Sequence, residues 1–147
     1  MEKLPDNINR VNHTKTIFNS LCATAGTLFT WLFGEWDVLF QVLATMMVLD
    51  YITGVIVAFI NNTVDSRIGF KGILKKVLML IVLIVGVLLD RLLKTEWLFR
   101  TAICYFLTGN EGLSMLENIG KTGINIPNKL KNALIQLKNE EDINNKK

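Results

Sequence analysis

Three long runs of apolar residues dominate the first two thirds of this 147-residue chain. Residues 17–34 carry no charged side chain, residues 38–60 carry only Asp50, and residues 77–89 carry none. A helix needs about 20 apolar residues to cross the hydrocarbon core of a bilayer, which is roughly 30 Å thick. The second run reaches this length alone, and the other two approach it with their flanks. The sequence therefore predicts an all-α, polytopic integral membrane protein.

The positions of lysine and arginine predict four membrane segments with both termini in the cytoplasm. Basic residues gather in an N-terminal arm (1–16), a loop (61–76) and a tail (123–147), and are scarce in the turns after the first and third runs. Basic loops are retained on the cytoplasmic side. The three basic segments share that side only if a weaker apolar segment also crosses. The expected membrane domain is 17–122, with segments near 17–34, 38–60, 77–93 and 97–118. Three crossings, or a fourth helix lying on the membrane surface, are the alternatives.

Asp50 is an unusual charge, because it lies near the middle of the second apolar run. A carboxylate at mid-bilayer costs about 2.5–3.5 kcal/mol on insertion scales, so such groups normally face a bundle interior or a water-filled cavity. On a helix, Asp50 shares a face with Thr53 and Gly54. This face is expected either to line a polar interior or to hold helices together by hydrogen bonds. Asp90, which precedes Arg91 near the end of the third run, is expected at the membrane interface.

A polar stripe occupies the end of the fourth segment. At about 100° per residue, five polar side chains fall within an arc of about 120° of a helix. These residues are Asn110, Glu111, Ser114, Glu117 and Asn118. The two glutamates are about 9 Å apart along the axis and have no metal ligand between them, which disfavours a catalytic or metal-binding pair. In an unbroken helix, Arg100 projects in the same direction. We expect the stripe to be the wet side of a helix that emerges into the cytosol; the alternative is a stripe facing the lumen of an oligomer.

The tail contains a second amphipathic segment, which begins near Pro127, a residue suited to the first turn of a helix. Apolar residues line one face of the segment and lysines project from the other. This pattern is typical of a helix lying on an anionic membrane surface. The alternative is a cytosolic helix that packs on the loops.

The chain offers little for enzyme chemistry. His13 is the only histidine, and Cys22 and Cys104 each lie in an apolar run without a neighbouring cysteine. There is no glycine-rich phosphate loop and no nucleophile elbow. We therefore expect no enzyme activity, no cofactor or metal ion, and no nucleic-acid partner.

Three motifs resemble the toxin-secretion/phage-lysis holin family of bacteria and their phages. They are LDYITG (49–54), the pattern S-x-x-G-x-x-G-x-x-K-K (66–76) and NEGLSMLENIGKTGINIP (110–127). Together they cover roughly residues 50–134, and the N-terminal segment 1–36 lies outside the resemblance. Asn125 departs from the pattern, since such sequences commonly have a proline there.

The resemblance implies a small holin that oligomerises in the bacterial cytoplasmic membrane. Its pores would let an endolysin (a cell-wall hydrolase) or a large toxin leave the cell. The partners implied are further copies of the chain, membrane lipids and the exported cargo. Candidate pore or helix-interface residues are Asp50, Thr53, Gly54, Asp90, Arg100, Asn110, Glu111, Ser114, Glu117 and Asn118, and the basic cytoplasmic loop contributes Arg67, Lys71, Lys75 and Lys76. A small carboxylate-dependent transporter or channel built on Asp50, and a membrane scaffold, are the alternative functions.

Overall fold

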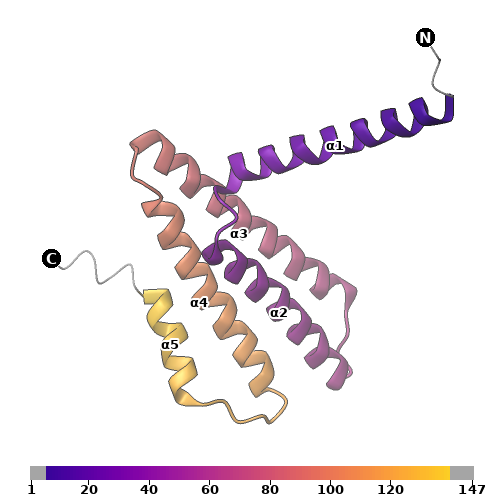
Figure 1. Cartoon of the computed structure of the whole chain (residues 1–147). Helices are drawn as coiled ribbons and strands as arrows, with labels where there is room; N and C mark the ends of the chain where they lie inside the picture. The colour runs from indigo at the N-terminus through magenta and orange to yellow at the C-terminus, as the bar shows by residue number, and fades with distance from the viewer. Residues whose placement is uncertain (1–5, 140–147) are drawn as a thin grey trace. The chain divides into compact units, whose positions relative to one another are not determined.

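The computed structural model describes residues 6–139, and its regular structure is helical throughout that range (Figure 1). The helices are α1 (Asp6–Phe33), α2 (Val38–Ile60), α3 (Ser66–Leu93), α4 (Leu98–Gly120) and α5 (Asn128–Asn139). The chain forms two compact units, Met1–Gly34 and Glu35–Lys147. The predicted all-α class is confirmed.

In the described part of the first unit, the single helix is α1. Its apolar part, Lys15–Phe33, is long enough to cross a membrane, and large side chains such as Ile17 and Phe18 are exposed. The hydroxyl groups of Thr24, Thr27 and Thr30 each donate a hydrogen bond to the carbonyl oxygen four residues earlier. These hydroxyls are satisfied within the helix, so they add little to the cost of placing α1 in lipid.

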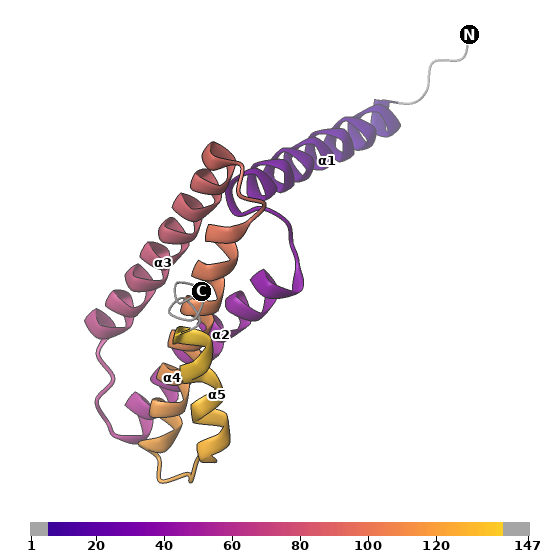
Figure 2. The same cartoon turned by 90° about the vertical axis from the view of Figure 1, so that its left-hand side faces the viewer.

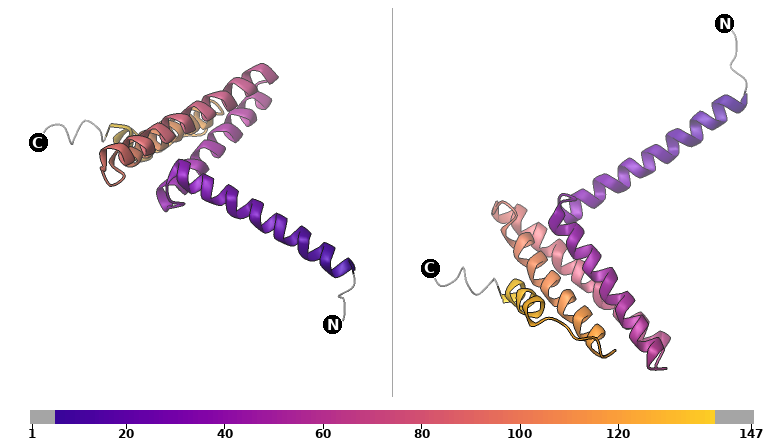
Figure 3. Two further views of the ribbon diagram at one scale, coloured as in Figure 1. Left: turned by 90° about the horizontal axis from the view of Figure 1, so that it is seen from above. Right: turned by 60° about the horizontal axis from the view of Figure 1, so that its bottom comes forward.

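The second unit is organised around α4, which contacts α2, α3 and α5. In Figures 1 and 2, α3 and α5 lie on different sides of α4. The right-hand view of Figure 3 shows α4 between α5 and α2. The antiparallel helices α2 and α3 contact each other much less than either contacts α4. The hairpin of α2 and α3 is therefore held together mainly through the helix that follows it.

The core of the second unit is narrow, whereas much of its outer surface is apolar. Leu43, Leu83, Val87 and Cys104 are fully buried between the helices. Many large aliphatic side chains of α2 and α3 are exposed, as expected for surfaces that face lipid rather than water. By length and hydropathy, three helices qualify as membrane spans: Lys15–Phe33, Val38–Ile60 and Ser66–Leu93. Helix α4 does not meet these criteria, so the fourth crossing stays a prediction.

The basic loop expected at 61–76 is only five residues long, because α3 begins at Ser66. The Asp65 carboxylate accepts a hydrogen bond from the backbone N–H of Arg67 and so caps the start of α3. The N-terminal arm expected at 1–16 is helical from Asp6 onward, and the apolar part of α1, Lys15–Phe33, agrees with the segment expected near 17–34. The second segment has the expected bounds, and the tail helix begins directly after Pro127.

Candidate functional site

The most unusual feature of the second unit is an ion network that joins three helices. The ammonium group of Lys76 on α3 lies 2.8 Å from Asp50 Oδ2 on α2, and it also contacts Glu111 Oε2 on α4. The Glu111 side chain is only 1% exposed, and those of Asp50 and Lys76 are each 15% exposed. One cation thus holds two carboxylates from different helices in a largely water-free position.

Asn118 extends this network along α4. Its Nδ2 donates a long hydrogen bond of 3.3 Å to Asp50 Oδ1 and lies 3.5 Å from Thr53 Oγ1. Thr53 in turn donates to the Asp50 carbonyl oxygen at 2.9 Å. Gly54 lies beside the same amide, and a methyl group there would be 3.5 Å from Asn118 Nδ2. The face of α2 predicted from Asp50, Thr53 and Gly54 therefore packs against α4.

The residues expected to form a wet stripe on α4 differ in exposure, and Glu111 does not lie on an exposed face. Glu111 is buried against Lys76, because α4 is covered on several sides by its neighbours. Glu117 is exposed, whereas Ser114 and Asn110 are partly buried. The five residues share one arc of the helix, but they meet different surroundings.

Lys76 lies on α3 and in the network, not in the basic loop expected from the sequence. A signal for its burial was present in the sequence. Lys76 precedes Met79, Leu83 and Val87 at intervals of three and four residues, and these three side chains form the buried face of α3. The other basic residues of this stretch, Arg67, Lys71 and Lys75, are also on α3 but are exposed.

Asp90 is buried between the end of α3 and the start of α4. Its carboxylate accepts hydrogen bonds from the backbone N–H groups of Phe99 (3.0 Å) and Arg100 (2.7 Å) at the start of α4. It also accepts one from the Thr95 hydroxyl at 2.6 Å. Asp90 therefore acts as a cap for α4, supplied by a different helix. A carboxylate at a helix N-terminus is favoured by the helix dipole as well as by these bonds.

Arg100 forms a second ion pair, with the turn that precedes α2. Its guanidinium contacts both carboxylate oxygens of Asp37, at 2.7 and 3.0 Å, and donates to the carbonyl oxygen of Glu35 at 2.8 Å. The Arg100 guanidinium holds the pKa of the Asp37 carboxyl below its usual range. Asp37 also caps α2 by accepting from the backbone N–H of Phe40. Arg100 and Glu111 project the same way from α4, but they are about 16 Å apart along the axis, so the two ion pairs are separate.

Helix α5 packs on a glycine face of α4. A methyl group added at Gly109 would lie 2.8 Å from the carbonyl oxygen of Leu134 and 2.9 Å from the backbone nitrogen of Lys138. Gly112 faces the Leu134 side chain, which is buried. The two backbones approach so closely that residue 109 has no room for a side chain. The tail helix therefore packs on α4 rather than on the loops.

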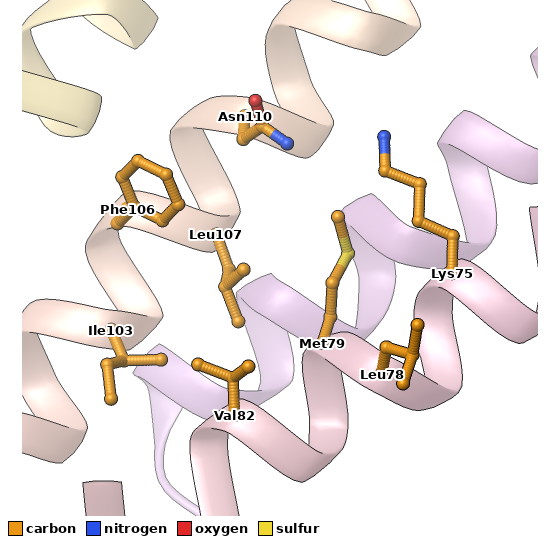
Figure 4. Close-up of a pocket in the computed structure, with 8 residues that line it drawn as sticks. All are labelled: Lys75, Leu78, Met79, Val82, Ile103, Phe106, Leu107 and Asn110. Carbon is orange, nitrogen blue, oxygen red and sulfur yellow. The ribbon is translucent and has the colours of Figure 1, made fainter.

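Two hollows flank α3. A wedge-shaped space of about 790 Å³ lies between α2 and α3, and the ring of Tyr51 projects from α2 to Gly69 and Gly72 of α3. A shallower groove of about 340 Å³ lies between α3 and α4 (Figure 4). In that view Lys75 and Asn110 lie at one end of the groove, and its floor is apolar. Lys75 lines both hollows.

The chemistry available in this arrangement is electrostatic. Among the described residues, no three His, Cys, Asp or Glu side chains are placed to hold a metal ion. The buried charges hold helices to one another, and outside them the surface is largely apolar.

Comparison with known proteins decides the family. A model of the bacteriophage holin family matches residues 27–139, which include α2, α3, α4 and α5. The chain belongs to the bacteriophage holin family. Holins are pore-forming membrane proteins, and the resemblance noted in the three sequence motifs is confirmed. Among the helices of this holin-family chain, only α1 lies largely outside the matched region.

Individual relatives cover most of the chain, and one of those described here carries a holin name. An uncharacterized 14.9 kDa protein of Clostridium perfringens is 49% identical over 134 residues, which are 90% of this chain and 98% of the relative. A protein named as a probable holin of Bacillus phage phi105 is 31% identical over 112 residues, which are 76% of this chain and 82% of the phage protein. No solved structure matches the chain significantly.

The three holin-like motifs meet in one region of the structure. The first supplies Asp50, the second supplies Lys76, and the third supplies Glu111 and Asn118. The glycines of the second motif lie against Tyr51 of the first. The motifs are thus the parts of the sequence that join α2, α3 and α4.

Proposed function

We propose that this chain is a holin that oligomerises in the bacterial cytoplasmic membrane and forms pores through which an endolysin or a large toxin leaves the cell. The observation that carries the proposal is the family match across α2 to α5, together with a relative named as a probable holin. Four membrane crossings with both termini in the cytoplasm complete the proposal, with α4 as the fourth crossing.

The second unit is too narrow to contain a protein-sized passage by itself, which supports a pore made of several copies. The helices of the second unit are held together by narrow contacts around α4, and their centre is filled by side chains such as Leu43 and Leu83. One copy has no room for a passage as wide as a folded protein. A pore for such a cargo must therefore form between copies, with apolar faces toward lipid and polar groups toward water.

The candidate polar residues divide into two groups under this proposal. Those that contact other helices of the same chain are proposed as interface residues: Asp50, Thr53, Gly54, Asp90, Arg100, Glu111 and Asn118. Glu117 is exposed, and Asn110 and Ser114 are partly exposed. These three residues are proposed to face the lumen or a neighbouring copy. The buried network would then keep each copy rigid while polar groups at its surface make the passage.

Controlled expression in a bacterium tests the proposal. We expect abrupt release of a large cytoplasmic reporter enzyme after a delay, and lysis when an endolysin without its own export signal is co-expressed. Lys76→Met should change the timing or extent of release, whereas Lys71→Met, at an exposed lysine of the same helix, should change it much less. Intact membranes at high levels of inserted protein, with only a monomer after mild solubilisation, would contradict pore formation.

The same experiment separates the alternatives. A carboxylate-dependent transporter would retain large proteins while carrying a small solute at a saturable rate, and Asp50→Asn would abolish that flux. A scaffold would neither release proteins nor transport solutes. The size of what escapes therefore decides among the three functions.

A further inference from the structure

The wedge between α2 and α3 combines apolar walls with charged side chains, as a binding site for an amphipathic ligand does. It has a volume of about 790 Å³ and is bounded by α2, the turn 61–65, the first half of α3 and the end of α4. Its walls are mostly apolar and include Val55, Ala58, Val64, Ile68 and Ile73. The space lies between two helices that contact each other little and whose outer side chains are largely apolar. Lipid chains surround such helices when they cross a bilayer.

More cationic than anionic side chains line the wedge. Of its two carboxylates, Asp50 is paired with Lys76, and Asp65 accepts the backbone N–H of Arg67 at the start of α3. Lys75 and Lys121 have no carboxylate partner in the part of the chain that the structure describes. Lys121 donates only a long hydrogen bond of 3.4 Å to the Asn118 amide oxygen. Two ammonium groups are thus left to bind an external anion.

Tyr51 adds a hydroxyl donor to this space. Its ring lies against Gly69 and Gly72, and its Oη atom is 3.5 Å from the position of a Cβ at Gly69. Within residues 6–139 the hydroxyl forms no hydrogen bond. Lys75 also stands at the end of the groove in Figure 4, beside Asn110, so its ammonium group can reach the polar end of both hollows.

We propose that the wedge is a binding site for an anionic phospholipid. The phosphate-bearing headgroup lies between Lys75 and Lys121, with the Tyr51 hydroxyl as a further donor, and one acyl chain lies on the apolar walls of α2 and α3. Basic pockets between membrane helices on the cytoplasmic side are suited to anionic headgroups. A soluble anion would leave the apolar walls without a partner, and a neutral lipid would leave the two cations without one. The proposal rests on the membrane location of the chain and not on its forming a pore.

Lipid titration of the purified full chain tests this site by native mass spectrometry. Phosphatidylglycerol and phosphatidylcholine with identical acyl chains are the probes. We expect one phosphatidylglycerol to bind in preference to phosphatidylcholine. Replacing both lysines (Lys75→Gln with Lys121→Gln) should weaken that binding roughly 30-fold, from the attraction that two basic residues near an anionic lipid provide. The matched control, Lys129→Gln with Lys131→Gln on α5, removes the same charge away from the wedge and should change binding little.

A second variant tests the acyl chain without changing charge. Ala58→Phe places a larger side chain in the wedge, in the space proposed for the acyl chain, and should weaken binding of phosphatidylglycerol. Helical content measured by circular dichroism is the control for folding. Glycerol 3-phosphate carries the headgroup chemistry without the chains and should bind far more weakly than the lipid.

Three outcomes would overturn the proposal. They are equal binding of the two lipids, equal effects of the two lysine pairs, and binding of glycerol 3-phosphate as tight as that of the lipid. A lipid-free dimer that dissociates when Lys75 and Lys121 are replaced would assign the wedge to a second copy instead. Release of the reporter enzyme from cells is scored separately, so a holin without a lipid preference is distinguishable from a protein that forms no pore.

Discussion

Replacing Lys76 by methionine tests the buried network most directly. Methionine retains much of the side-chain length but removes the ammonium that contacts Asp50 and Glu111. At the 2.8 Å separation from Asp50, with an effective dielectric constant of about 20, Coulomb's law gives an attraction of about 6 kcal/mol. Desolvation of the charges offsets much of this attraction. Removing one partner of a buried ion pair nevertheless costs about 3–5 kcal/mol, because the remaining charge has no counter-ion.

Thermal unfolding of the full chain in detergent, followed by helical circular dichroism, measures this cost. We expect the midpoint for Lys76→Met to fall by roughly 10 °C or more, since each kcal/mol shifts the midpoint by several degrees in a domain of this size. Lys75→Met is the matched control, because Lys75 is adjacent in sequence and exposed. Neutralising Asp50 and Glu111 together with Lys76 should recover part of the loss, because no unpaired charge then remains. Midpoints for the two lysine variants that agree within about 2 °C would refute the reasoning.

Three further changes have defined outcomes. Gly109→Ala should displace α5, because its methyl group would collide with the backbone of that helix, and trypsin should then cleave the tail faster; Gly112→Ala, which meets only a flexible side chain, should do so less. Asp90→Ala should destabilise the chain by about 2 kcal/mol in unfolding experiments through loss of the cap on α4, and an unchanged midpoint would remove that role. Asp37→Asn should destabilise near neutral pH but not in acid. The Asp37 pKa is lowered by Arg100, so its contribution is present above the ordinary carboxyl pKa of about 3.9 and is lost as pH falls through the lowered value. A stability difference between Asp37→Asn and the unchanged chain that is the same at every pH would contradict this assignment.

The sequence was most informative where a pattern is local. The bounds of α2 were predicted correctly because an apolar run lies between Asp37, which caps the helix, and the turn that begins at Asn61. The position of Asp50 on a helix-packing face follows from the same periodicity. The start of α3 differs from the expected loop because Arg67, Lys71, Lys75 and Lys76 suggest a polar connection, whereas charged side chains are equally compatible with a helix that extends beyond the hydrocarbon core.

The network itself was not predictable from one helix at a time. Periodicity places Glu111 on an arc of α4, but only the approach of α3 determines that Lys76 meets it. Without that partner, a glutamate beside Asn110 and Ser114 has the pattern of a water-exposed face. The docking of α5 depends in the same way on two glycines of α4, whose spacing alone does not identify the helix that packs there.

The contact between α4 and α5 also constrains where water must be. Gly109 is at the midpoint of Leu98–Gly120, so if α4 crosses the bilayer, the end of α5 that carries Lys138 reaches the depth of the bilayer centre. A lysine facing lipid there costs about 2.5–3.5 kcal/mol. Lys129 and Lys131 also lie on exposed positions of α5. A spanning α4 can therefore keep α5 docked only where the outer side of α5 is hydrated, and in an environment of lipid alone the tail helix must leave. Attachment of α5 thus reports on the presence of water at membrane depth.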